Sequence, residues 1–299
     1  MRAISLILRV VALTFVLFVC FSIGSGIAMR GIAPPSSADG SATISLVVVC
    51  ALETIVVSYL ILRSRWAGWR LMLAIFVVFY GVSTFMGQSE SVVFLTQLPA
   101  GMVPRLFLMG FLTAAPFSVL AVIILGKRNA HLTDHQPNTR LIMPASEWGW
   151  KLAVIAVAYV ILYFTFGYFI AWRNPAVREY YGGADPGSFL AQMGTVVRDR
   201  PWLVPFQIFR AMCWVALALL VIRMLKGQRT ETALAIGLLF SVVMNAQLLL
   251  PNPYMPEPVR MAHLVETASS NLMFGFFVGW LLTPTPRFDR LLATTPVAG

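Results

Sequence analysis

Apolar stretches of about 20 residues recur along almost the whole chain, separated by short polar connectors. Each stretch is long enough for a helix to cross a hydrocarbon core about 30 Å thick. In lipid the backbone polar groups must pair within their own segment, so helices are the expected form. Soluble domains carry roughly 25% charged residues, whereas this chain has 11% charged and 59% hydrophobic residues. We therefore predict an all-α, polytopic transmembrane helix bundle.

The polar connectors divide the chain into about eight predicted spans, whose ends are marked by charge, proline and glycine. The predicted spans are Ile4–Met29, Ser41–Leu62, Leu71–Gln88, Arg105–Leu125, Trp150–Trp172, Trp202–Arg223, Thr232–Leu250 and Val259–Leu282. An alternative concerns the first span. Its two early arginines, its apolar run and the SGIA sequence after it also fit a signal peptide cleaved after Ala28, which would leave seven spans.

The basic residues indicate which side of the membrane each connector faces. The connectors RSRWAGWR (63–70) and RMLKGQR (223–229) are strongly basic, whereas residues 87–104 contain no Lys or Arg. Because short cytoplasmic loops are enriched in Lys and Arg, we predict that both termini are cytoplasmic, in a cell membrane that we take to be a bacterial inner membrane. The net charge of +10 then reflects topology. We expect no nucleic-acid partner, because the basic residues do not gather on a soluble face.

The two halves of the chain resemble each other. Gln88 follows Arg70 by 18 positions, and Gln247 follows Arg229 by the same distance. We therefore predict a 4+4 parallel repeat, an arrangement known among secondary transporters; chance similarity between membrane helices is the alternative. The predicted organisation is a first transmembrane half at residues 1–128, a cytoplasmic linker at 129–149, a second transmembrane half at 150–285 and a cytoplasmic tail at 286–299.

Seven polar residues fall at membrane depth in the predicted spans, and they form the candidate substrate-binding or proton-coupling site. They are Glu53, Arg210, Asn245, Gln247, His263, Glu266 and Asn271. A charged side chain at the bilayer centre costs about 2.5–3.5 kcal/mol on insertion scales, so such residues are functional candidates. Arg210 and Glu266 share a depth on different helices, so we predict an ion pair between them. The alternative for the uncharged residues is that they only join helices by hydrogen bonds.

Three functions fit these residues. The first is a transporter or permease-like binder with a pocket open to the outside, in which Arg210 attracts an anionic group and Glu53 or Glu266 carries a coupling proton. The second is an intramembrane enzyme acting on a lipid or apolar substrate, with His263 as general base and Glu266 or Glu53 as acid. The third is a non-catalytic assembly or sensor subunit.

The sequence contains neither HExxH nor GxSxG, the motifs of metalloproteases and of α/β-hydrolases. We expect no metal and no cofactor. The expected partners are the lipid bilayer and a small-molecule or lipid-like ligand; the sequence leaves the ligand's identity and the oligomeric state open.

Overall fold

The structure is a computed structural model that describes residues 3–32, 40–95, 98–134 and 140–283, and in this part of the chain every regular element is a helix. Seven helical segments are long and apolar enough to cross a membrane: Ala3–Ala28, Ser41–Leu62, Gly68–Phe94, Met102–Ile124, Ala145–Ala171, Leu203–Met224 and Arg229–Leu249. The last helix, α11 (Glu257–Leu282), has 26 residues. It is not among the seven, because it carries three polar residues of the predicted site, His263, Glu266 and Asn271. The described residues thus contain seven candidate spans, one fewer than the eight predicted, and α11 as an eighth long helix.

The outside of the bundle is apolar, as a lipid-facing surface must be. Large aliphatic and aromatic side chains stand exposed along the helices; for example, Ile4 is 73% exposed, Phe15 67% and Ile44 68%. A soluble protein rarely leaves such an extended apolar surface in water. The described helices therefore form the bundle of a multi-pass membrane protein.

The first half of the bundle contains α1 (Ala3–Ala28), α2 (Gly40–Leu62), α3 (Gly68–Tyr80) and α5 (Met102–Ile124). The second contains α6 (Ala145–Phe166), α9 (Leu203–Met224), α10 (Arg229–Leu238) and α11. Contacts within the first half join α1 to α2, α1 to α5 and α3 to α5, and contacts within the second join α6 to α9, α6 to α11 and α10 to α11. The same pattern of contacts thus recurs in the two sets of four helices, whereas the repeat itself and the boundaries between halves, linker and tail remain predictions.

The connectors that resembled each other in the sequence lie against each other. Arg65 N–H donates to the carbonyl of Met224 over 2.7 Å, and Lys226 N–H donates to the carbonyl of Arg63 over 3.0 Å. The two connectors thus form an isolated antiparallel bridge between Ser64 and Leu225.

Three of the long helical segments change to π-helical geometry, and in two of them this is followed by a further helix. The π-helix η1 (Gly81–Met86) joins α3 to α4 (Gly87–Phe94), and the π-helix η4 (Leu239–Val243) follows α10 and leads to the 3-10 helix η5 (Ala246–Leu249). The third span therefore does not end at Gln88, because the helix continues to Phe94. The apolar residues 91–102 were expected to be either a re-entrant stretch or a continuation of that helix, and the structure shows a continuation as far as residue 94. No Pro interrupts residues 87–94, and Glu90, the one charge there, has a partner inside the bundle. π-Helical turns are rare overall, but those that occur are frequently located at functional sites.

The start of α1 and the end of α11 lie at the same end of the bundle, which we call the terminal end. At the opposite end lie two short helices, α7 (Pro175–Tyr181) and α8 (Phe189–Asp199), which connect the π-helix η3 (Gly167–Ala171) to α9. We call it the α7 end. The 3-10 helix η2 (Ala130–Leu132) lies in the connector between α5 and α6. Residues 284–299, which include the predicted tail, lie outside the described part of the chain.

Small residues let α10 and α11 approach each other closely. A Cβ atom added to Gly275 would lie 2.8 Å from the Cα atom of Gly237 and from the carbonyl oxygen of Ile236, and one added to Gly279 would lie 2.6 Å from the Cα atom of Ala233. Gly275 and Gly279 form a GxxxG pair, which favours close helix packing in membranes.

We expect Gly275→Ala to lower the free energy of unfolding by about 1–3 kcal/mol, the cost of overpacking against backbone that cannot move aside. The measurement is thermal unfolding of the purified protein in detergent. Gly26→Ala is the matched control, because a Cβ added there meets nothing within 4 Å. Equal unfolding temperatures for the two variants would contradict the close packing of α10 and α11.

Candidate functional site

A cavity lies where α4, α6, α9 and α11 meet, and we call it the Arg210 cavity. Its cavity volume is about 30 Å³, within a hollow of about 390 Å³ of non-atom space that includes open solvent. Its lining is Glu90, Tyr159, Leu162, Tyr163, Arg210, Met244, Glu266, Thr267, Ser270, Asn271 and Phe274. At about 1.5 Å per residue, Glu266 lies ~14 Å along α11 from its first residue, so the cavity belongs to the half of the bundle nearer the α7 end.

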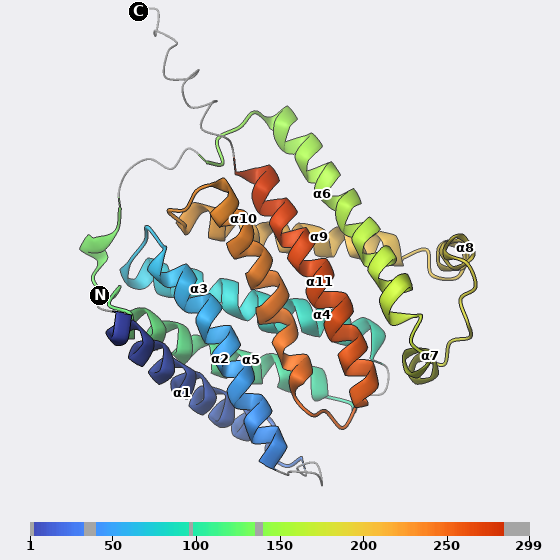
Figure 1. Cartoon of the computed structure of the whole chain (residues 1–299), viewed down its shortest axis with the longest axis horizontal. Coiled ribbons are helices and arrows are strands. Elements are labelled where there is room, and N and C mark those ends of the chain that lie inside the picture. The colour runs from blue at the N-terminus through green and yellow to red at the C-terminus, as the bar shows by residue number, and fades with distance from the viewer. Residues whose placement is uncertain (1–2, 33–39, 96–97, 135–139, 284–299) are drawn as a thin grey trace, which may run out of the picture.

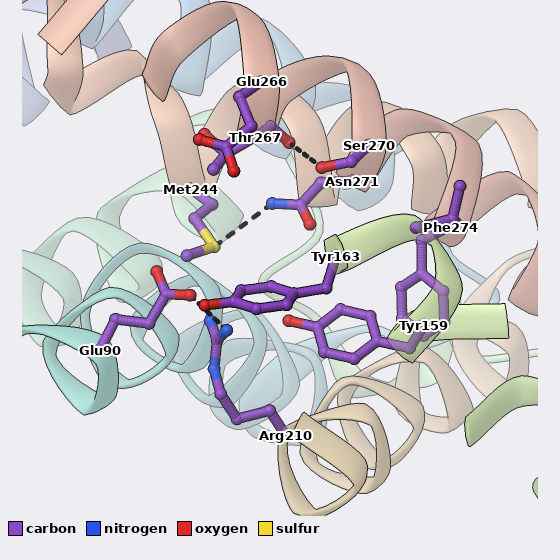
Figure 2. Close-up of a pocket in the computed structure, with 11 residues that line it drawn as sticks. Glu90, Tyr159, Tyr163, Arg210, Met244, Glu266, Thr267, Ser270, Asn271 and Phe274 are labelled. Carbon is purple, nitrogen blue, oxygen red and sulfur yellow. Dashed lines mark hydrogen bonds and ion pairs between the residues drawn. The ribbon is translucent and has the colours of Figure 1, made fainter. Parts of the chain in front are cut away.

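On one side of the cavity, Arg210 forms an ion pair with Glu90. A guanidinium nitrogen of Arg210 donates to a carboxylate oxygen of Glu90 (Figure 2). The same nitrogen also lies 3.2 Å from the side-chain oxygen of Gln207, and the other terminal nitrogen lies 3.4 Å from the carbonyl oxygen of Met86. Arg210 is 2% exposed, so this pair, rather than water, neutralises its charge.

The predicted ion pair between Arg210 and Glu266 is therefore wrong. Arg210 pairs with Glu90, and the carboxylate of Glu266 lies across the cavity on α11. Glu266 Oε2 instead lies 2.7 Å from His263 Nδ1, one helical turn earlier. The sequence could not rank the two carboxylates, since equal depth does not show which helices touch.

A chain of hydrogen bonds connects Glu266 to the α7 end of the bundle. His263 Nε2 lies 3.2 Å from the hydroxyl of Tyr181 on α7, while Nδ1 faces Glu266. Burial raises the pKa of the Tyr181 phenol, so the phenol keeps its proton and donates to Nε2. A neutral imidazole then carries its proton on Nδ1 and donates to Glu266. We assign this tautomer because it satisfies all three groups.

The assigned tautomer sets the charge of the cavity. Glu90 and Arg210 cancel; when His263 is neutral, the carboxylate of Glu266 keeps its negative charge, whereas a protonated His263 forms an ion pair with that carboxylate. By formal charge, the lining therefore carries one net negative charge, held on α11. A lone carboxylate in a partly buried site attracts a cationic group.

Aromatic and amide side chains complete the walls. The phenol oxygen of Tyr163 points toward Glu90 and Arg210 (Figure 2). The hydroxyl of Tyr159 accepts from the indole N–H of Trp214 over 3.3 Å, which fixes its ring. Asn271, one of the residues expected from the sequence, lines the cavity and lies 3.5 Å from the sulfur of Met244.

The other predicted site residues lie elsewhere. Asn245 donates to the carbonyl of Ser241 over 2.8 Å and accepts from Thr267 over 2.6 Å, so it joins α10 to α11 and does not line the Arg210 cavity. Gln247 donates to the carbonyl of Ser83 over 3.2 Å. Glu53 and Gln247 line a second cavity, in the first half of the bundle. The structure thus divides the predicted set between two places.

Sequence reasoning missed Glu90, Tyr159 and Tyr163 as lining residues. Glu90 was placed in an outer connector because the third span was ended at Gln88. The signal that points to it is that residues 88–94 contain neither Pro nor Gly. The tyrosines gave no signal, because aromatic residues are common in membrane helices.

Within the described residues, no group of three or more His, Cys, Asp or Glu side chains is arranged to hold a metal ion. Comparisons with protein-family models, with curated proteins and with solved structures find no match.

Proposed function

We propose that the protein is a membrane transporter that binds a small ammonium-bearing substrate in the Arg210 cavity. The observation that supports this proposal most is the composition of the cavity, which places two carboxylates and one guanidinium beside tyrosines inside a bundle of apolar helices. Ionisable residues within membrane spans commonly mark substrate pathways.

The proposed substrate is a cation or zwitterion because the uncompensated charge is the carboxylate of Glu266. The sequence suggested an anionic substrate held by Arg210, but Arg210 is already paired with Glu90. Tyr159, Tyr163 and Phe274 line the same cavity as Glu266. An ammonium group over an aromatic face gains about 0.5–2 kcal/mol, with the larger value where water is excluded.

The architecture also favours transport. Matching helices in two halves and discontinuous helices near the site are typical of secondary transporters. Here Glu90 follows the π-helix η1 and Met244 follows the π-helix η4, and both residues line the cavity. We propose that the terminal end faces the cytoplasm, because the basic connectors lie there, and that the Arg210 cavity opens toward the outside.

The enzymatic alternative finds less support. A general base must lie within reach of the substrate, but His263 does not line the Arg210 cavity, and its ring nitrogens contact Glu266 and Tyr181. An assembly or sensor subunit needs no polar cavity with a net charge. We therefore favour transport over both.

A ligand screen in detergent tests the proposal. Tetramethylammonium, ethanolammonium and neutral amino acids serve as the cationic and zwitterionic probes, with acetate and phosphate as anionic comparisons. A probe at 100 times its dissociation constant stabilises the folded protein by about 2.7 kcal/mol. We expect a rise in unfolding temperature with at least one ammonium-bearing probe and none with the anions. Stabilisation by the anions alone would contradict the proposed substrate class.

A further inference from the structure

The second cavity, which we call the Glu53 cavity, lies in the first half of the bundle among α1, α2, η1 and α5. Its cavity volume is about 30 Å³, within a hollow of about 490 Å³ of non-atom space that includes open solvent. Its polar lining consists of Glu53, Ser83, Thr84, Gln88, Thr113 and Gln247, and the rest is mainly Leu, Phe, Val and Met. None of its lining residues is Lys, Arg or His.

Glu53 is buried without a counter-charge. The residue is 5% exposed, and no described group hydrogen-bonds to its Oε1 atom. The side-chain oxygen of Gln88 in the same cavity also lacks a partner among the described residues. An unpaired carboxylate in an apolar environment is costly, and it becomes neutral most simply by binding a proton.

The groups around Glu53 do not neutralise it. From α1 and α2 the nearest titratable groups are the thiols of Cys20 and Cys50. The hydroxyl of Ser83 donates to the carbonyl of Phe79, and that of Thr113 donates to the carbonyl of Met109. These hydroxyls therefore offer only lone pairs to the cavity.

Two helices connect the Glu53 cavity to the Arg210 cavity. On α4, Gln88 lines the first and Glu90 lines the second, two residues apart. Beyond η4, Gln247 lines the first and Met244 lines the second. The side chain of Gln247 also donates to Ser83 on η1, so the two irregular segments are hydrogen-bonded to each other.

We infer that Glu53 is a proton-binding site whose occupancy is coupled to ligand binding in the Arg210 cavity. When Glu53 takes up a proton, its carboxyl becomes a hydrogen-bond donor and can bond to an amide oxygen such as that of Gln88. When it releases the proton, both oxygens need donors, which Gln88 and Gln247 supply through their amide N–H groups. Each change in the protonation of Glu53 rotates the side-chain amide of Gln88 on α4 or of Gln247 on η5. The same segments position Glu90 and Met244, which line the Arg210 cavity. The coupling rests on the proposed function, whereas the proton site itself does not.

Infrared difference spectroscopy of the full-length protein in detergent tests the proton site without any ligand. A pH titration of wild type should show the C=O band of a protonated carboxyl that is lost as the pH rises. We expect this band to be absent in Glu53→Gln and present in Glu266→Gln and Cys50→Ser. Gln88→Leu, which keeps the carboxyl, should retain the band with a shifted midpoint. A band that persists unchanged in Glu53→Gln would overturn the inference, as would loss of the band on adding Na⁺ at constant pH.

The coupling is tested by measuring the affinity for the ammonium-bearing probe across the same pH range. Coupling between two sites typically changes affinity by about 5- to 150-fold. We expect a change of this order in wild type and none in Glu53→Gln. An affinity in Glu53→Gln that depends on pH as in wild type would overturn the coupling. Absence of probe binding to every variant would count against the proposed function, while the infrared result would still decide on the proton site.

Discussion

Replacing Arg210 with Met is expected to lower the free energy of unfolding by about 3–5 kcal/mol, because breaking a buried ion pair leaves the partner charge uncompensated. In this variant Glu90 stays in the bundle, with 27% of its side chain exposed, and loses its guanidinium. Thermal unfolding in detergent measures the effect. Arg178→Ala is the matched control. It removes an ion pair with Asp185 outside the spans, and its unfolding temperature should match that of wild type, since exposed pairs contribute little.

The double variant Arg210→Met/Glu90→Leu distinguishes the pair from simple loss of packing. Replacing both members of a buried pair by apolar residues is often neutral or stabilising, so we expect the double variant to be more stable than Arg210→Met alone. The single variant Glu90→Leu completes the comparison. If the stability losses of Arg210→Met and Glu90→Leu simply added in the double variant, Arg210 and Glu90 would not interact, and the ion pair in the cavity would be contradicted.

Glu266→Gln is expected to weaken binding of the ammonium-bearing probe by about 30-fold or more. Removing one partner of a buried charge pair costs about 2–5 kcal/mol of binding energy, and each 1.4 kcal/mol is about tenfold in the dissociation constant. Isothermal titration in detergent measures the affinity. The folded state should survive, because Gln has nearly the same shape and still offers an oxygen to His263.

Tyr181→Phe is the matched control for Glu266→Gln. It removes the hydroxyl at the far end of the hydrogen-bond chain and leaves the carboxylate in place. We expect its affinity for the probe to stay much closer to that of wild type. Equal losses in the two variants would mean that the hydrogen-bond chain as a whole, rather than the charge of Glu266, determines binding.

The sequence predicted the fold well, because each span is recognised by a local property, namely a continuous run of apolar residues. The ends of α2, α9 and α11 agree with the predicted spans to within a few residues. The predictions failed where a helix continued past a polar stretch, as it does from Gln88 to Phe94. A hydropathy pattern places the charged Glu90 outside the membrane. It contains no information about Arg210, which pairs with Glu90 inside the bundle.

The sequence pointed to several residues of the candidate site, but it did not predict which of them lie together in space. Glu53, Arg210 and Glu266 all stood out as ionisable residues at membrane depth. Their division between two cavities depends on which helices touch, and no single-helix property contains that information. Gln88 and Gln247 lie at equal distances after Arg70 and Arg229 in the sequence. Both glutamines line the Glu53 cavity although they come from different halves of the chain.

Flux through the protein tests the transporter proposal most directly. The ammonium-bearing compound that gives the largest stabilisation in the screen, radiolabelled, would be offered to liposomes containing wild type, Glu266→Gln or no protein. We predict uptake into wild-type liposomes well above that into protein-free liposomes, and uptake near the protein-free level for Glu266→Gln. Binding of the compound to wild type without any flux above the protein-free level would contradict the account, and would mark the cavity as a receptor site rather than a transport site.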